Sequence, residues 1–536
     1  FGAAVKGYSW IVRRLLRLAA VALLVYAGLL VLTFFGFKQV PSGFIPTQDQ
    51  GYLIVFAQLP DGASLQRAEE VRNQISVLTR TVPGVAHSVE FAGFAALDGT
   101  NRNNAVSVFL PLAPFEDRVK DPRLNGFAIM AQVRRKVAQI QDARVLVFPP
   151  PPVQGIGNAG GFKIQIEDRR GAGLSALQAA TDQLIAKAGT GHGLVGLFTS
   201  FRSQVPQLYL EIDRRKVETL DVPVTSVFNT LQAYLGSTYV NDFNFVNRTD
   251  QVNVQAEARF RIQPSSIRDL YTRNNKGAMV PLGTLMSIQE TAGPDKVMHY
   301  NVYPSAEING NTLPGFSSGQ AIDVMQNLAD QTLPTQFGYE WTELSLQQIL
   351  AGNSAVYIFP LCALFVFLVL AAQYESWSLP LAIILIVPMC LFAAITGVFI
   401  RGSDNNIFTQ VGFVVLIGLA CKNAILIVEF GKQQMDSGRN RQDAAIEASR
   451  LRLRPILMTS FALTLGVLPL VSAVEPGSEM RQALGTAVFS GMIGVTLFGI
   501  FLTPVFFSVV MKVFPDRRPE SSVSEVAAGR EAVSRH

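Results

Sequence analysis

The sequence has few charged residues and few of the residues that most often carry catalysis. Only 16% of its 536 residues are charged and 49% are hydrophobic, which is too apolar for a typical soluble protein of this length. Its four histidines, His87, His192, His299 and His536, lie in no motif typical of catalysis. No G-x-x-x-x-G-K-[ST] sequence is present, so the chain contains no recognisable ATP-driven motor.

Cysteine is also scarce. Cys362, Cys390 and Cys421 all lie within long apolar stretches, so the rest of the chain has no disulfide framework. That remainder must be stabilised by a packed core, and it is long enough to form one. No cleavable signal pattern precedes the first apolar stretch.

Long apolar windows are the most informative feature that is present. Each of six windows has about the 20 residues that a helix needs to cross the hydrocarbon layer, and five of them occupy the last third of the chain. They cover about Leu18–Phe37, Ser354–Ala372, Leu379–Ile400, Ile407–Phe430, Pro455–Ala473 and Ala483–Val510. The sequence therefore predicts one transmembrane helix, a large extramembrane segment and then five more transmembrane helices.

Basic residues in the short connections predict the orientation of these helices. They cluster before the first window, between the fourth and fifth, and after the last, whereas the opposite short loops hold only Arg401 and Arg481. The positive-inside rule then places both ends of the chain in the cytoplasm and exports residues 38–353. The net charge of +5 follows from these cytoplasmic flanks and requires no nucleic-acid partner.

The exported segment alternates strand-like and helix-like patterns. The first unit has strands at 52–59, 85–94, 105–112 and 144–148 and helices at 64–80 and 127–140, with Ser64 as an N-cap. This β-α-β-β-α-β order is that of a split ferredoxin-like unit. A second unit is predicted from strands at 162–168, 195–201, 207–213 and 299–310 and helices at 174–188 and 318–330. An insertion at about 214–293 contains a polar hairpin pattern at 237–261.

Two short motifs resemble enzyme signatures but lack the required context. GFSSG at 315–319 fits a nucleophile elbow, yet NGNTLP precedes it in place of a core strand, so we interpret Ser317 or Ser318 as a helix N-cap. GIGNAG at 155–160 follows four prolines and leads into a strand, which is not the geometry of a dinucleotide site. A membrane-anchored hydrolase that uses GFSSG is kept as an alternative.

Lys422 is a cation near the middle of the fourth window, in GLACKNAILIVEF (418–430). A lysine at the centre of a transmembrane helix costs about 2.5 to 3.5 kcal/mol, so such residues usually face a protein interior and serve ion or proton movement. Our hypothesis is that Lys422 exchanges partners as a membrane carboxylate gains and loses a proton. The alternatives are a static pair with Glu429 or a lysine that reaches water in a crevice. No other acid in the chain lies at a comparable depth, so the partner must come from elsewhere.

Long stretches of the chain resemble the resistance-nodulation-division exporters of the AcrB type. They are GLACKNAILIVEFGK, RLRLRPILMTSFALTLGVLPL and ALGTAVFSGMIGVTLFGIFLTPVFF for the last three spans, AAQYESWSLPLAIILIVP for the eighth and ninth, and YLGSTYVNDFNFVNRTDQVNVQAEARFR for a docking-domain hairpin. The family has twelve spans in two similar halves. The resemblance implies the carboxy-terminal half, beginning in the cytoplasmic connecting helix.

The resemblance also implies the residues that move protons. Lys422 matches the family's lysine on the tenth span, Thr459 a threonine on the eleventh, and Arg452 the arginine just before it. In the family two aspartates on the fourth span pair with that lysine, and they would belong to the amino-terminal half of the pump. The coupling ion would be a proton, with no other cofactor and no metal.

The same resemblance divides the chain into parts. It implies an α+β membrane protein with one plus five transmembrane helices and a periplasmic segment of ferredoxin-like porter subdomains and a docking subdomain. The expected ranges are 1–17 (connecting helix), 18–37 (first span), 49–155 (porter subdomain), 156–206 with 294–341 (second porter subdomain), 207–293 (docking subdomain), 354–511 (five-helix bundle) and 512–536 (cytoplasmic tail).

Drug contacts follow from the resemblance as well. The segment FAGFAALDGTNRN (91–103) falls where the family has a switch loop between two drug pockets, here with Gly93, Gly99 and Asn101. Phe91, Phe94 and Phe148 would line those pockets, because aromatic faces suit varied apolar guests. Ordinary core packing is the alternative for each phenylalanine.

The resulting prediction is a multi-pass protein of a Gram-negative inner membrane that exports amphiphilic drugs in exchange for protons and is not an enzyme. Its expected partners are two further copies in a homotrimer, a periplasmic adaptor protein, an outer-membrane channel and the lipid bilayer. An exporter of metal ions or lipids is the alternative within the family. The methionines of the exported segment, Met130, Met279, Met286, Met298 and Met325, are too scattered to predict a soft-metal site.

Overall fold

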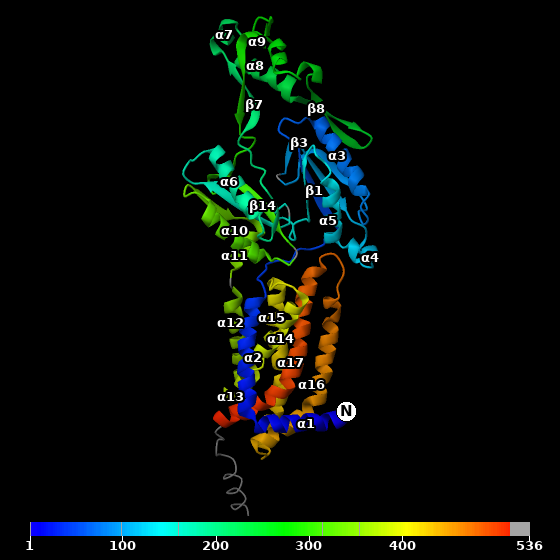
Figure 1. The fold of residues 1–536 in the computed structure, drawn as a ribbon, viewed down its shortest axis with the longest axis vertical. Coiled ribbons are helices and arrows are strands. Elements are labelled where there is room, and N and C mark those ends of the chain that lie inside the picture. The colour runs from blue at the N-terminus through cyan, green and yellow to red at the C-terminus, as the bar shows by residue number, and fades with distance from the viewer. Residues whose placement is uncertain (1, 98, 159, 314, 353, 515–536) are drawn as a thin grey trace, which may run out of the picture.

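The computed structural model describes residues 2–97, 99–158, 160–313, 315–352 and 354–514. It consists of a bundle of long helices with two α/β lobes next to each other at one end of it and a third lobe beyond them (Figure 1). The predicted tail at 512–536 lies mostly outside these residues, as do His536 and residue 98 of the predicted switch loop.

Six helices of the described residues are long and apolar enough to cross a membrane, and all six predicted windows are confirmed as helical. The third span is interrupted at Leu385–Ile386, close to Pro388, whose ring disfavours continuous helix. The last three spans extend beyond their apolar windows. The six spans are α2 (Ala19–Gln39), α12 (Ser354–Tyr374), α13 (Ser378–Ile384) together with α14 (Val387–Arg401), α15 (Ile407–Asp436), α16 (Arg441–Val471) and α17 (Ser478–Val513).

Helix α1 (Gly2–Arg17) lies across the end of the bundle that is distant from the lobes (Figure 1). Tyr8, Val12 and Leu16 form its buried face, and the Tyr8 hydroxyl donates a hydrogen bond to the Ile500 carbonyl at 2.7 Å. This helix therefore runs along the bundle end and does not extend the first span.

The first lobe (52–148) has the element order predicted for the first unit. Its antiparallel sheet has the order β2-β3-β1-β4, and α3 and α5 cover one face of that sheet. The Ser64 hydroxyl accepts a hydrogen bond from the Arg67 N–H, which confirms the predicted N-cap. The elements are β1 (Tyr52–Gln58), α3 (Leu65–Arg80), β2 (Val89–Ala95), β3 (Thr100–Pro111), α4 (Phe115–Arg118), α5 (Gly126–Val137) and β4 (Arg144–Phe148).

The second lobe (162–204 with 294–351) also has one sheet and a helical layer. Its sheet has the order β13-β14-β5-β15. β6 also pairs with β14, on the same edge as β13 but at the opposite end of the strand. The elements are β5 (Phe162–Asp168), α6 (Leu174–Ala188), β6 (Leu194–Phe198), β13 (Met298–Tyr300), β14 (Tyr303–Thr312), α10 (Ser318–Thr332), β15 (Phe337–Trp341) and α11 (Glu343–Ala351).

One predicted strand of the second unit belongs elsewhere. The strand expected at 207–213 is β7 (Val205–Ile212), and it pairs with β12 (Met286–Gly293) in a separate two-stranded ribbon. The edge position beside β5 is taken instead by β15, which the sequence pattern did not reveal. The insertion therefore begins at 205 and not at 214.

The ribbon of β7 and β12 carries the third lobe (205–293), which lies farthest from the bundle (Figure 1). The polar hairpin predicted within 237–261 is confirmed as β8 and β9. The remaining elements are small and surround a compact apolar cluster. Beyond the ribbon, the elements of the third lobe are α7 (Arg214–Thr219), α8 (Val224–Leu231), β8 (Thr238–Phe245), β9 (Arg248–Val254), β10 (Tyr271–Arg273), β11 (Met279–Pro281) and α9 (Leu282–Leu285).

The segment 40–51, here called the connector, joins α2 to the first lobe and is bonded to several parts of the molecule. The Asn405 N–H donates to the Pro41 carbonyl at 2.9 Å, and the Gly477 N–H donates to the Asp49 carbonyl at 3.2 Å. On the lobe side, the buried Asp49 carboxylate pairs with the Arg118 guanidinium at 2.7 Å. The connector is thus fixed to both membrane loops on this side and to the first lobe.

Candidate functional site

Lys422 lies halfway along α15. Asn406 caps this helix by accepting a hydrogen bond from the Thr409 N–H at 3.0 Å, and the buried face of α15 packs against α14, α16 and α17. Lys422 lies outside that face and is exposed. Within the part of the chain that the structure describes, its ammonium makes no hydrogen bond or ion pair. The lysine therefore presents an uncompensated charge on the surface of the bundle, at mid-span.

The static pair with Glu429 is not formed. Lys422 and Glu429 are seven residues apart on one helix, a rise of about 10.5 Å, and both side chains are exposed. No ion pair joins them in the described structure. This alternative for Lys422 is therefore not supported by the geometry.

Thr459 lies on α16 at the same level as Lys422. The residues that follow each of them, Asn423 and Ser460, are both buried, and the Asn423 amide donates a hydrogen bond to the Ser460 hydroxyl at 3.1 Å. Buried polar contacts of this kind hold neighbouring transmembrane helices in a fixed register. The Thr459 hydroxyl donates to the Ile456 carbonyl of its own helix at 3.1 Å.

Arg452 lies away from Lys422. It precedes Thr459 by seven residues on the same helix, so it is displaced by about 10.5 Å toward the end of the bundle distant from the lobes. Its guanidinium lies over the Phe430 ring at 4.4 Å, and its Nε is buried without a hydrogen-bond partner in the described residues. The structure therefore brings Lys422 and Thr459 to one level and leaves Arg452 two turns below them.

The three predicted drug-contact phenylalanines lie in different environments. Phe91 is 45% exposed and makes edge-to-face contacts with Phe94 and Phe109, with ring centroids 6.1 and 6.0 Å apart. Phe148 is only 3% exposed and belongs to an apolar cluster that also contains Phe198 of the second lobe. Phe148 thus packs where two lobes meet, whereas Phe91 offers free aromatic surface.

The segment predicted as a switch loop is mostly a β-hairpin. β2 continues to Ala95 and β3 begins at Thr100, so only 96–99 connect the strands, and β3 starts five residues earlier than the sequence pattern indicated. Gly93 forms a bulge between β2 and β3 at a φ of +81°, and Gly99 has a φ of +64°, conformations that favour glycine. The exposed Asn101 pairs with Phe94 across the hairpin.

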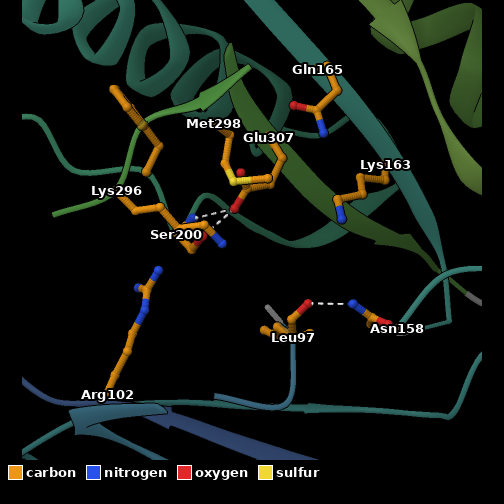
Figure 2. Close-up of a pocket in the computed structure, with 10 residues that line it drawn as sticks. Leu97, Arg102, Asn158, Lys163, Gln165, Ser200, Lys296, Met298 and Glu307 are labelled. Atoms are coloured by element: carbon orange, nitrogen blue, oxygen red, sulfur yellow. Dashed lines mark hydrogen bonds between the residues drawn. The ribbon is translucent and has the colours of Figure 1, made fainter. Parts of the chain in front are cut away.

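A small polar cavity lies between the first and second lobes, next to this hairpin (Figure 2). Its volume is about 140 Å³. Leu97 and Arg102 line it from the first lobe, and the second lobe contributes Lys163, Lys296 and Glu307 among others. The Asn158 amide donates to the Leu97 carbonyl at 2.7 Å at its edge. None of the three predicted phenylalanines lines it.

Sequence reasoning missed several residues near Lys422 and around the cavity between the lobes. Asn423 and Ser460 could have been found, because each is a polar residue beside a predicted site residue within an apolar run. The residues that close the cavity between the lobes come from segments about 60 to 200 positions apart, and no local pattern connects them. The predicted N-cap at GFSSG is confirmed as Ser317, which forms a capping box with Gln320.

Six apolar helices, a lysine at mid-span and large lobes on one side define a multi-pass membrane protein with an extensive extramembrane part. Residues 1–511 match the AcrB/AcrD/AcrF family, and the chain therefore belongs to this family of resistance-nodulation-division multidrug efflux transporters. Membership of a transporter family excludes the hydrolase alternative.

Relatives of known name agree with this assignment. The chain is 37% identical to the toluene efflux pump membrane transporter TtgB of a Pseudomonas putida strain, over 98% of this chain and 50% of that protein. It is also 37% identical to the multidrug export protein AcrF of Escherichia coli, over 92% of this chain and 47% of that protein. The chain spans about half the length of these relatives.

Proposed function

We propose that this chain forms the carboxy-terminal half of a pump that exports amphiphilic drugs in exchange for protons. The observation that supports this function best is the position of Lys422: mid-span, exposed and without a counter-charge in the described residues. A cation at that depth requires an acid nearby, and the family resemblance supplies two aspartates on a span of the other half. Proton uptake by those aspartates would release Lys422 and change how the two halves pack.

The surroundings of Lys422 support this role. Thr459 lies at the same depth on α16, and the Asn423–Ser460 hydrogen bond holds the two helices in register. A hydroxyl at this level can donate to or accept from the proton-carrying groups. Arg452, two turns away, would stabilise the cytoplasmic end of the path.

The lobes would carry the drug. We assign 49–155 and 156–206 with 294–341 to two periplasmic porter subdomains and 207–293 to a docking subdomain, with the cytoplasmic ends of the spans at α1. The pump would act as a homotrimer in the inner membrane with a periplasmic adaptor and an outer-membrane channel. Phe91 and Phe94 would offer aromatic surface to apolar guests, and the hairpin with Gly93, Gly99 and Asn101 would separate the pockets. Phe148 would line a drug pocket from its position at the interface between the lobes.

The test is Lys422→Ala in the complete pump. We expect export of an amphiphilic dye from cells to fall to the level of cells without the pump, while the protein still reaches the membrane and assembles. The matched control is Lys512→Ala, which removes a lysine at the end of α17, where water can solvate the side chain. Normal export by the Lys422→Ala pump would show that Lys422 is a water-solvated lysine and would end the proton-coupling proposal.

A further inference from the structure

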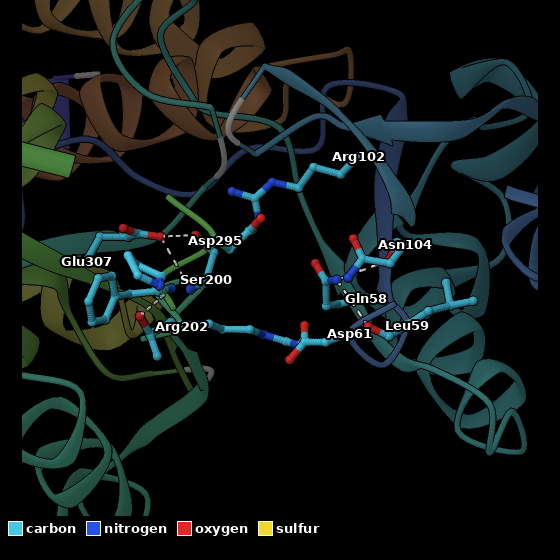
Figure 3. Close-up of polar contacts among 12 residues, drawn as sticks. Gln58, Leu59, Asp61, Arg102, Asn104, Ser200, Arg202, Asp295 and Glu307 are labelled. Carbon is cyan, nitrogen blue, oxygen red and sulfur yellow. Dashed lines mark hydrogen bonds and ion pairs between the residues drawn. The ribbon is translucent and has the colours of Figure 1, made fainter. Parts of the chain in front are cut away.

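Two ion pairs connect the first and second lobes across the rim of the cavity described above (Figure 3). Asp61, in the turn before α3, pairs with Arg202. Arg102, on β3, pairs with Asp295 at 3.2 Å. The first lobe thus contributes one acid and one base, and the second lobe contributes the opposite charge in each pair.

The partners from the second lobe lie where the chain leaves it and where the chain returns. Arg202 precedes β7, Asp295 follows β12, and the Asp295 N–H donates to the Arg202 carbonyl at 3.2 Å. Both segments are therefore held together at the base of the ribbon that carries the third lobe.

The segment that carries Arg202 is firmly fixed to the second lobe. The Ser203 N–H and hydroxyl both donate to the Gln178 side chain of α6 at 2.7 Å, and the Ser200 hydroxyl donates to the buried Glu307 carboxylate. Arg202 is consequently held by the second lobe itself, so its ion pair with Asp61 connects the two lobes.

The cavity behind these pairs is too small for a drug-sized ligand. Its volume is about 140 Å³, whereas pockets for drug-sized ligands measure roughly 300 to 1,000 Å³. Arg102 belongs to both features, because it lines the cavity and forms one of the ion pairs. A ligand can therefore enter between the lobes only if they separate, and separation must break the pairs.

The two pairs are suited to repeated breaking. Between 12% and 41% of each of the four side chains is exposed, and partly exposed ion pairs of this kind contribute little net stability because water replaces the lost partner. The other contacts between the lobes are different. The cluster with Phe148 and Phe198 is buried, and the Arg144 guanidinium donates to the Leu197 carbonyl at 3.0 Å, close to where the chain crosses from one lobe to the other.

We propose that Asp61–Arg202 and Arg102–Asp295 form a latch that holds the first and second lobes closed, with the contacts of Phe148 and Phe198 as the pivot. This inference rests on the proposed function in one respect: the ligand admitted on opening is an amphiphilic drug. The latch itself depends only on the contacts between the lobes. Exchanging the acid and the base within either pair reverses its polarity without changing the net charge of the protein.

The latch is tested by reversing charges in the complete pump. Asp61→Arg and Arg202→Asp each place like charges opposite one another, and the double variant D61R/R202D restores a pair of reversed polarity. Spin labels at Arg67→Cys on α3 and Lys187→Cys on α6, in a background without Cys362, Cys390 and Cys421, report the distance between the lobes. We expect both single variants to lengthen this distance and the double variant to return it to that of the unaltered protein.

Export is measured on the same set of variants. We expect each single variant to lose about fivefold in export rate, the lower end of typical coupling between sites, and the double variant to recover. Asp142→Arg and Arg170→Asp, which reverse exposed charges elsewhere on the two lobes, serve as controls and should change neither readout. If a single reversal prevents assembly, Asp61→Asn and Arg202→Gln replace it.

The outcomes are separable. Unchanged distances in the single variants, or a double variant that does not recover, would overturn the latch. Longer distances with normal export would overturn its role in admitting the drug. Because the distance is measured on purified protein without a proton gradient, it tests the latch even if Lys422→Ala disproves the proposed coupling.

Discussion

Asp168, at the end of β5, is a buried carboxylate that is stabilised by backbone N–H groups. Burial raises its pKa, but the N–H groups of Ala172, Gly173 and Arg170 donate to its oxygens at 2.9, 2.9 and 3.3 Å and outweigh that effect. The pKa of Asp168 therefore lies below the usual range of an aspartate. The ionised side chain organises the turn that leads into α6.

The sign of the pH dependence follows from this lowered pKa. The ionised form stabilises the folded state above about pH 4, the pKa of an unfolded aspartate, and this contribution disappears as pH falls through the lower native pKa. We expect Asp168→Asn to accelerate amide hydrogen exchange at residues 170–173 by about tenfold at neutral pH, because hydrogen bonds to a charged group are lost. Asp142→Asn, at an exposed position, should leave exchange unchanged. Equal exchange in both variants would contradict the role of Asp168.

At this scale the sequence revealed only part of the candidate site. Lys422 was predictable because a charge within an apolar run is costly and therefore conspicuous. Asp168 was not predictable, since an aspartate at the end of a strand is common. Its structural role depends on the turn that it stabilises, and the sequence does not reveal that turn. The latch residues were also hidden, because Asp61 and Arg202 are 141 positions apart and neither occurs in a distinctive local pattern.

Helix α17 is the element around which the membrane bundle packs. It contacts α14, α15 and α16 extensively, and several glycines allow their backbones to approach closely. A Cβ at Gly494 would lie 2.1 Å from the Ala393 Cβ of α14, and one at Gly491 would lie 2.2 Å from a Leu416 methyl of α15. Both distances are too short for two carbon atoms, so these positions require glycine.

Gly494→Ala should therefore destabilise the bundle although alanine favours helix. Alanine gains about 1 kcal/mol in helix propensity over glycine, but overpacking a tight interface costs about 1 to 3 kcal/mol. We expect a lower apparent Tm for purified Gly494→Ala in detergent. Gly28→Ala on α2, where nothing lies within 4 Å of the added Cβ, should not lower it. An unchanged Tm for Gly494→Ala would mean that α14 and α17 can separate freely.

Elements were easier to predict than their pairing. Hydrophobic length identified all six spans, and capping patterns located helices such as α3 and α10, because these signals are local. β7 was assigned to the wrong sheet because its partner β12 lies more than 70 residues away and alternation does not specify a partner. The start of β3 was predicted five residues too late for a related reason: Gly99 resembles a loop residue but serves as the turn that leads into the strand.

At the scale of the whole molecule, the connector joins the membrane helices to the lobes at fixed points. Its residues 41–44 bond to the α14–α15 loop, and Asp49 bonds to the α16–α17 loop and to the first lobe, where the Asp49 carboxylate pairs with Arg118. The Asp49 N–H also donates to the Glu479 carboxylate of α17 at 3.2 Å. The α14–α15 loop leads into α15, the helix that carries Lys422. A displacement of that helix therefore acts directly on the connector.

An alanine inserted between Pro46 and Thr47 should uncouple these two attachment points. The added residue lengthens the connector by up to about 3.6 Å, so both sets of hydrogen bonds cannot be kept without distortion. We expect export by the complete pump to fall while assembly is retained. An alanine inserted between Asn275 and Lys276, in the exposed turn from β10 to β11, is the control. Full export with the connector insertion would rule out the connector as a mechanical link.

The two-stranded ribbon at the base of the third lobe has a further consequence. Val205 and Gly293 are register partners, so the chain departs from the second lobe and comes back to it at adjacent points about 5 Å apart. Nearly ninety residues can thus be accommodated without disturbing the parent sheet. The distal lobe is in this sense a separable module, and its replacement by another insertion would leave the two lobes nearer the bundle unchanged.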